Sequence, residues 1–356
     1  MILDPFPYRS LIFIPVLLLT LYTFYSTTGA SSTDYQLALG WLTISFVYMD
    51  YIVITDAQRE LRQVPDTFKD GFENASLWRR VRWAASLLVS PRGVGWAHEP
   101  RNALPPHPPK ELSRTRFVLQ RLRTLAVLCL LHDLGDLHAR ANPMFHSDGP
   151  GLRADGWFWR FVVTFSWAMS TSTMLCAGFT AVSIVAVATG VSEPYLWPAF
   201  MGGPREAYTI RRLWGRAWHQ LMRRFVSAHG RRLVEILGLR RGGNPSAYTQ
   251  LFVAFFLPAI VHYGAETMAF RSWHGGSLTF FMLQPFAIML EDLVLYLGRR
   301  AGLESDWWRY VGYMTTWAWF AWCLPIWLEP IIVAGFTMDV LPVSVIMCVT
   351  NLFFPV

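Results

Sequence analysis

The sequence predicts an all-α integral membrane protein that crosses the bilayer several times. Of its 356 residues, 53% are hydrophobic and only 15% are charged, whereas soluble domains have about 25% charged residues. The apolar residues are gathered in blocks of about 20, the length at which a helix crosses the hydrocarbon core. Because helices satisfy their own backbone hydrogen bonds in lipid, we predict about eight transmembrane helices. A soluble α/β enzyme, a disordered chain and a secreted disulfide scaffold do not fit this composition.

The expected membrane-spanning segments follow one another along the chain. They are 11–29, 35–54, 117–137, 158–190, 249–270, 278–298, 310–328 and 331–353. Charged and titratable residues, among them Arg121, His132 and Asp133, interrupt the third segment. The fourth is longer than a perpendicular crossing needs, so it is either strongly tilted or contains a re-entrant piece.

Two long hydrophilic segments separate these spans and are rich in arginine. The first, 57–116, is also rich in proline, and the second, 193–247, has few acidic residues to balance its bases. Because loops rich in Lys and Arg stay on the cytosolic side, both segments and both chain ends are expected there. The chain then divides into a transmembrane pair at 1–56, a cytosolic loop at 57–116, and a core at 117–356 that includes the second loop.

The charge and the cysteines point to the same class of protein. Retention of the basic loops in the cytosol explains the net charge of +7, so this charge does not indicate a nucleic-acid partner. The cysteines lie in apolar segments without the spacing of a metal site or a disulfide framework; they are Cys129, Cys176, Cys323 and Cys348. We expect small buried side chains, with no bound metal or cofactor.

The second loop contains a basic and aromatic stretch that is expected to form one cytosolic amphipathic helix. Its basic face would carry Arg212, Arg216, His219 and Arg223, and its aromatic face Trp214 and Trp218. Such a helix suits either of two roles: it can anchor at the membrane interface, or its guanidinium groups can bind phosphates such as those of coenzyme A. The pattern alone leaves both open.

His262 is the second candidate, because it lies well inside the apolar segment 249–270. A titratable side chain at that depth is costly and is by default a candidate functional residue. Imidazole titrates near neutrality, so it can take a proton from a hydroxyl group and return it to a leaving group. Glu266 follows one helical turn later and is expected to hold the ring in one tautomer. The alternative is a structural histidine that is hydrogen-bonded to a neighbouring helix.

Glu291 and Asp292 form a third candidate near the expected cytosolic end of the segment 278–298. Arg299 and Arg300 follow one to two turns later. Ion pairs within the helix or with another helix are the simpler interpretation. Glu291 is also a candidate substrate-binding residue.

The motifs of the second loop, with those on either side, resemble a known family. The run Trp-Pro-Ala-Phe-Met-Gly-Gly at 197–203 is followed by Glu-Ala-Tyr at 206–208 and by Arg-Arg-Leu-Trp-Gly-Arg-Ala-Trp-His-Gln at 211–220. An Arg-Gly-Val-Gly-Trp segment at 92–96 precedes them, and His262 follows in an apolar helix. This order resembles the wax synthase-like membrane-bound O-acyltransferases, and in particular fungal members that acetylate terpenoid and meroterpenoid products.

Some positions differ from those of plant wax synthases. Those enzymes have a Ser-Gly step shortly before the catalytic histidine and an acidic residue directly after it, whereas Pro258 and Ala259 precede His262 here and Tyr263 follows it. Leu213 stands where a Phe is usual. These differences favour an acetyltransferase over a wax synthase that esterifies long-chain alcohols.

The resemblance implies an enzyme that transfers an acyl group from acyl-CoA, here acetyl-CoA, to a hydroxyl of a lipophilic acceptor. His262 would be the general base and His219 would orient the thioester. Arg212, Arg216 and Arg223 would hold the donor's phosphates, with Trp214, Trp218, Glu266 and Glu291 as further substrate contacts. Acyl-CoA is then a co-substrate and not a bound cofactor. The acceptor would arrive through the bilayer, with the endoplasmic reticulum as the expected membrane.

Two other classes of function use similar residues. Intramembrane His, Asp and Glu also build ion paths in transporters, but the sequence has no inverted repeat. A scaffold that binds lipids through the same arginines is the third possibility.

The expected orientation can be tested by glycosylation. The sequon Asn74-Ala75-Ser76 lies in the first basic loop, so Asn74 should stay unmodified in the native chain. A reporter sequon near Ser147 should be glycosylated, and one near Gly243 should not, as judged by the mobility shift after glycosidase treatment. A glycan on Asn74 would reverse the orientation.

Overall fold

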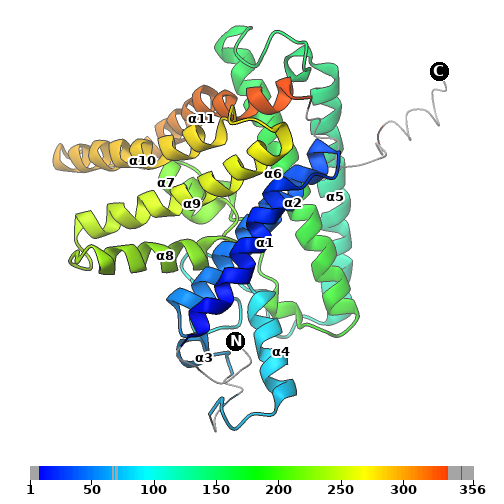
Figure 1. Ribbon diagram of the computed structural model, residues 1–356. Helices are drawn as coiled ribbons and strands as arrows, with labels where there is room; N and C mark the ends of the chain where they lie inside the picture. Colours follow the sequence, from blue (N-terminus) through cyan, green and yellow to red (C-terminus); the bar gives the residue numbers. More distant parts are fainter. Residues whose placement is uncertain (1–7, 66–67, 69–70, 336–345, 347–356) are drawn as a thin grey trace. The chain divides into compact units, whose positions relative to one another are not determined.

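The computed structural model describes residues 8–65, 68, 71–335 and 346, and these residues form helices and connecting segments with no named strand. The helices in Figure 1 are α1 (Phe13–Tyr25), α2 (Ser31–Tyr48), α3 (Ala57–Glu60), α4 (Leu77–Leu88), α5 (Arg114–Ala141), α6 (Gly156–Ala188), α7 (Ile210–Arg212), α8 (Arg223–Ile236), α9 (Asn244–Phe270), α10 (Ser277–Arg300) and α11 (Trp308–Val333). The all-α prediction is confirmed for this part of the chain.

Five helices are long and apolar enough to cross a membrane. They are Ser31–Ile54, Gly156–Ala188, Asn244–Phe270, Ser277–Arg300 and Trp308–Val333. The first of them joins α2 to a π-helical segment, Met49–Ile54. α6 is one uninterrupted helix of 33 residues, about 50 Å long at a rise of 1.5 Å per residue. The re-entrant alternative for this segment is therefore wrong, and a tilted crossing fits its length.

The exact number of spans stays a prediction. The segment Arg9–Tyr25 is apolar but shorter than these five, and the 28-residue α5 is not one of the apolar helices. The last expected span, 331–353, begins within α11; apart from 346, its residues from 336 onward, Cys348 among them, lie outside the described residues.

Two compact units are each assembled from segments that are distant in the sequence. The first contains Met1–Asn102 and Gln220–Leu293, and the second contains Ala103–His219 and Val294–Val356. The three-part division predicted from the sequence follows loops and spans instead of packing, and it stays a prediction.

In the first unit, α2 packs against both α1 and α9, and α8 packs against α9. Figure 1 shows α1 and α2, in blue, beside α9, in yellow. Gly264 of α9 makes this approach possible, because a Cβ there would lie 2.5 Å from Cδ1 of Leu42 and 2.8 Å from Cζ of Phe24. The side of α9 near His262 is therefore in direct contact with both N-terminal helices.

A buried ion pair joins the far end of α2 to the start of α8. Asp50 is fully buried, and its Oδ2 lies 3.0 Å from Nε of Arg224. Thr55 donates its hydroxyl to Oδ1 of Asp50 at 2.6 Å. Removing one partner of a buried pair costs about 3–5 kcal/mol, so the pair determines which ends of α2 and α8 meet.

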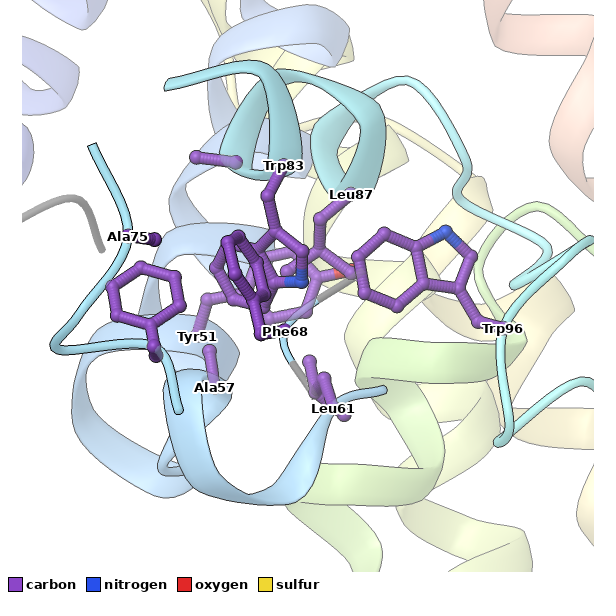
Figure 2. Close-up of a cluster of buried hydrophobic side chains, with 10 residues drawn as sticks. Tyr51, Ala57, Leu61, Phe68, Ala75, Trp83, Leu87 and Trp96 are labelled. Carbon is purple, nitrogen blue, oxygen red and sulfur yellow. The ribbon is translucent and has the colours of Figure 1, made fainter. Parts of the chain in front are cut away.

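Most of the expected cytosolic loop 57–116 belongs to the first unit, and much of that part is folded. Figure 2 shows its aromatic core, in which Trp83 packs against Phe72 and Trp96 with ring centroids 5.1 and 5.7 Å apart. Gly93 and Gly95 have positive φ angles of 68° and 80°, the turn geometry that brings Trp96 into this core. The Arg92–Trp96 motif therefore has a structural role here.

The second unit contains α5, α6 and α11. A polar seam joins α5 to α6: Nδ1 of His132 lies 3.0 Å from the carbonyl oxygen of Ser170, and Nδ1 of His138 lies 2.9 Å from Oγ of Ser166. These contacts satisfy polar groups that would otherwise be costly in an apolar setting. They explain why a helix with so many titratable residues packs along its length against the apolar α6.

Candidate active site

His262 is held on α9 by one polar contact and one aromatic contact. Its Nδ1 lies 3.1 Å from the hydroxyl oxygen of Tyr35, on α2. Its ring stacks on Phe281, on α10, with centroids 5.0 Å apart and planes 16° from parallel. The last residue of α9 is Phe270, about 12 Å further along the helix axis. The imidazole therefore has a defined position and ring plane inside an apolar helix.

Glu266 anchors the start of α10. Its Oε2 accepts hydrogen bonds from the hydroxyl of Ser277 at 2.9 Å and from the amide of the same residue at 3.3 Å. Gly275 passes so close that a Cβ there would overlap this carboxylate. A negative charge at a helix N-terminus is favourable. The contact found at Nδ1 of His262 comes from Tyr35, and a contact of Glu266 with the ring stays a prediction.

No pattern in the sequence singles out Tyr35. The two partners are 227 positions apart, and Tyr35 lies at the edge of an apolar segment where an interfacial tyrosine is ordinary. Only the packing of α2 on α9 identifies it.

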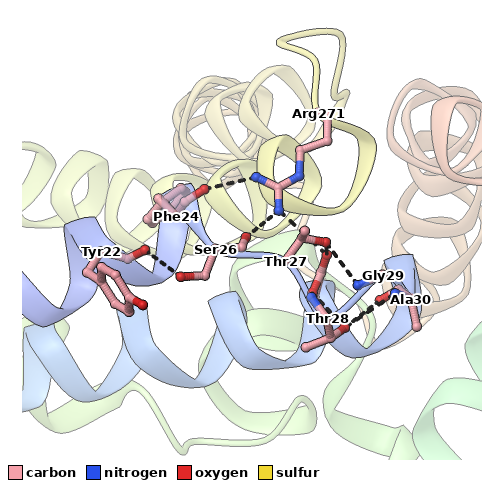
Figure 3. Close-up of polar contacts among 9 residues, drawn as sticks. Tyr22, Phe24, Ser26, Thr27, Thr28, Gly29, Ala30 and Arg271 are labelled. Carbon is pink, nitrogen blue, oxygen red and sulfur yellow. Dashed lines mark hydrogen bonds and ion pairs between the residues drawn. The ribbon is translucent and has the colours of Figure 1, made fainter.

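A polar clamp at Arg271 joins the end of α9 to the connection between α1 and α2, as Figure 3 shows. Arg271 donates to the carbonyl oxygen of Phe24 at 3.1 Å and to that of Ser26. Its guanidinium also lies 3.7 Å from Oδ2 of the buried Asp34, which accepts from the amide of Thr28 at 2.8 Å. Arg271 has a left-handed backbone, with φ 53°, which ends α9 and turns its side chain to the α1–α2 connection. Because Tyr35 directly follows Asp34, the clamp also restrains the position of Tyr35.

The single amphipathic helix predicted across 211–225 is wrong. α7 continues as a π-helical turn, Leu213–Ala217, after which Trp218 has an extended backbone with φ −73° and ψ 157°. A new helix, α8, begins at Arg223. The predicted basic face of Arg212, Arg216, His219 and Arg223 therefore does not exist as one helical row.

At the break, a neighbouring loop binds the carbonyl of the last π-helical residue. The carbonyl of Ala217 accepts from the amide of Gly202 at 2.9 Å, and the amide of Trp218 donates to the carbonyl of Leu213 at 2.7 Å. Gly202 must be glycine, because a Cβ there would overlap the carbonyl oxygen of Arg216. The first glycine of the Gly-Gly step in the 197–203 run thus lies at a close approach between two backbone segments.

His219 lies directly after this break, between two aromatic rings of the second unit. Its ring centroid is 5.7 Å from that of Phe200 and 5.2 Å from that of Trp218. Phe200 in turn packs on Phe179 of α6 at 4.9 Å, and Trp218 contacts Trp214 at 6.0 Å. The motif residues on both sides of the break therefore form one aromatic cluster that contains the imidazole.

The predicted donor-binding arginines have local partners. Arg212 pairs with Glu206 and lies over the ring of Tyr208 at 4.7 Å, and Arg216 lies 3.8 Å from the same carboxylate. One acid for two bases leaves this segment positive. Arg223 donates to Oε1 of Gln220 at 2.8 Å.

The predicted site residues fall into two groups, one in each compact unit. The first unit holds His262, Glu266, Arg223 and Glu291; the second holds His219, Arg212, Arg216, Trp214 and Trp218. Glu291 is partly buried on α10, and its neighbour Asp292 accepts from the hydroxyl of Tyr248, on α9, at 3.2 Å. Within the described ranges, no group of three or more His, Cys, Asp or Glu side chains is placed to hold a metal ion.

Positive charge is concentrated where α8 meets the folded loop of the first unit. Burial, together with Arg224 and Arg231, lowers the pKa of His98 to about 4. His98 is therefore neutral at pH 7, because burial and the two arginines oppose a further positive charge at this position.

Comparison with known proteins supplies the family. Residues 197–283, which include His219 and His262, match the model of the "Membrane bound O-acyl transferase family". No solved structure matches the chain.

Curated relatives match over most of their length. "Acetyltransferase ple2" of Rhodocybe pseudopiperita is 38% identical over 325 residues, 90% of this chain and 84% of its own. "Acetyltransferase eriL" of Hericium erinaceus is 37% identical, over 91% of this chain and 85% of its own. "Acetyltransferase aurG" of Calcarisporium arbuscula is 33% identical, over 73% and 67%.

The close approach at Gly202 predicts a sharp difference between two adjacent glycines. Gly202→Ala should lower stability by about 1–3 kcal/mol, as overpacking against a fixed backbone does, and should lower the midpoint of thermal unfolding in detergent. Gly203→Ala is the matched control, because a Cβ at Gly203 meets no atom within 4 Å. Equal midpoints for the two variants would contradict the backbone contact.

Proposed function

Because the chain belongs to the membrane bound O-acyl transferase family, we propose that it acetylates a hydroxyl group of a lipophilic acceptor, with acetyl-CoA as the donor. It is a membrane-bound enzyme that transfers acyl groups, and the relatives reported above are named acetyltransferases. The observation that carries the proposal is His262, a titratable ring held in place inside an apolar helix by Tyr35 and Phe281.

His262 is proposed as the general base, acting through Nε2. As the acceptor oxygen attacks the thioester carbonyl, Nε2 takes the hydroxyl proton, and the imidazolium then gives this proton to the departing thiolate of coenzyme A. The C–O bond forms, the C–S bond breaks, and the enzyme returns to its starting protonation state. Proton transfer by a positioned side chain contributes about 10²–10⁴ to the rate. Holding both substrates in reacting geometry supplies much of the remainder.

His219 is proposed to orient the thioester. Its ring lies between Phe200 and Trp218, so it is more rigid than a histidine on a free amphipathic helix would be. The indoles of Trp214 and Trp218 offer apolar surface to the pantetheine arm. A joint role of His219 and His262 is a proposal, because the two residues belong to different compact units.

The donor's phosphates are proposed to bind Arg212 and Arg216, with Arg223 as a further contact. Arg216 remains 46% exposed while it contacts Glu206, so its guanidinium is accessible to an incoming phosphate. Guanidinium groups suit phosphate because they donate two hydrogen bonds in a planar fork. The basic loops are expected on the cytosolic side, where acyl-CoA is available.

The acceptor is proposed to be a hydroxylated terpenoid or meroterpenoid that enters from the bilayer, with Glu266 and Glu291 as candidate contacts and the endoplasmic reticulum as the membrane. A wax synthase activity on long-chain alcohols is the alternative, and the names of the relatives favour acetyl transfer. Supplying microsomes with acetyl-CoA or palmitoyl-CoA and a panel of terpenoid and fatty alcohols, and measuring the esters, tests this choice.

The general-base role predicts the result of replacing His262. His262→Gln should insert normally but lose at least about 99% of turnover, the typical effect of removing a positioned base. His229→Gln is the control, because His229 lies on α8, where its Nδ1 is 2.8 Å from the carbonyl oxygen of Phe225 and its ring packs on Phe46 and Phe225. Turnover close to wild type in His262→Gln would leave His219 or Glu266 as the next base to test.

The donor site predicts a specific kinetic change at Arg216. Charge-assisted hydrogen bonds are worth about 1.5–3 kcal/mol each, so Arg216→Ala should raise KM for acetyl-CoA about tenfold or more and leave KM for the alcohol nearly unchanged. Arg241→Ala removes the same charge from a side chain that is 80% exposed and paired with Glu235, and it should leave both constants unchanged. Unaltered donor kinetics in Arg216→Ala would assign this arginine a structural role.

A further inference from the structure

We propose that Tyr35 is a positioning residue for acyl transfer, which acts by holding the imidazole of His262 at its Nδ1 so that Nε2 can act as the base. The inference rests on the proposed function of His262. It follows from the contact between the tyrosine hydroxyl and Nδ1 at 3.1 Å, and from three features that hold the two side chains in register.

The first feature is the burial of Tyr35. Tyr35 is 9% exposed, and a buried tyrosine hydroxyl requires a hydrogen-bond partner. Its partner is a ring nitrogen of the proposed base. When Nδ1 carries the ring proton, the hydroxyl accepts it, and Nε2 then carries the lone pair that a base needs.

The second feature is the clamp at the start of α2. Asp34, the residue before Tyr35, is buried against the α1–α2 connection and lies 3.7 Å from the guanidinium of Arg271. Arg271 ends α9, the helix that carries His262. Asp34, next to Tyr35, and Arg271, beyond His262, are thus in contact with each other. A shift of α2 along α9 would break this charged contact.

The third feature is the aromatic wall. Phe281 stacks on the imidazole at 5.0 Å and restricts rotation of the ring out of its plane. Stacking alone does not distinguish the two ring nitrogens, because both lie in the ring plane. The hydroxyl of Tyr35 contacts one of them, Nδ1.

The test removes one oxygen atom. Tyr35→Phe keeps the ring and its packing, and it should lower kcat by about 10- to 100-fold, the scale of a misplaced reacting group. KM for acetyl-CoA and for the alcohol should change by less than about twofold, because no substrate contact is removed. Tyr51→Phe is the matched control, because Tyr51 lies in the π-helical extension of the same helix, is 4% exposed and belongs to the aromatic core of the folded loop. The turnover of Tyr51→Phe should stay at the wild-type value. All rates are normalised to folded protein measured by size-exclusion chromatography in detergent.

A double-mutant cycle separates positioning from a general structural effect. If Tyr35 acts through His262, Tyr35→Phe should change the residual rate of His262→Gln by less than about twofold, which radiolabelled acetyl transfer can measure. A loss of the same size in both backgrounds, or a raised KM, would overturn the positioning role. So would wild-type kcat in Tyr35→Phe while His262→Gln is inactive. Full activity of His262→Gln would instead overturn the general-base proposal itself.

Discussion

Taking a carboxylate out of water is costly unless a positive group accompanies it, and α2 with its π-helical extension carries a buried aspartate near each end. Asp34 lies at the clamp with Arg271, and Asp50 pairs with Arg224. Arg271 follows the last residue of α9, and Arg224 lies on α8, the helix before α9. Ion pairs with both arginines require α2 to pack on α9 antiparallel and in one register. Gly264 then allows the close contact that this register requires. The position of Tyr35 against His262 is a consequence of these pairs.

The two halves of the proposed chemistry are made rigid in different ways. In the first unit, charged pairs and one glycine fix the helices, and the imidazole receives one hydrogen bond and one stacking contact. In the second unit, His219 is held by aromatic rings and by a loop whose Gly202 amide closes the end of a π-helical turn. A π-helical turn at a functional segment is a common association, and here it places the histidine after the break instead of on a helix face. Preorganisation of this kind limits the reorganisation needed when two substrates meet.

The folded part of the first basic loop changes how that loop is understood. Its glycine turns and tryptophans form a core that also includes Tyr51, at the end of the α2 segment. The loop therefore supports the same helix end that carries Asp50, and it contributes to the register of α2 through packing. Burial and the charges of Arg224 and Arg231 lower the pKa of His98 in the same region.

Composition and apolar block length determined that this chain is a helical membrane protein, because the hydrocarbon core imposes a length and a backbone requirement that are visible locally. The motif order also identified the family, whereas the role of the histidine at position 262 stays a prediction. The sequence could not determine the break at Trp218, because that break depends on the amide of Gly202 in another loop. Nor could it pair Tyr35 with His262 across 227 positions. Helical periodicity reports neighbours within one element, whereas these contacts form only when separate helices pack, and the tertiary structure alone decided them.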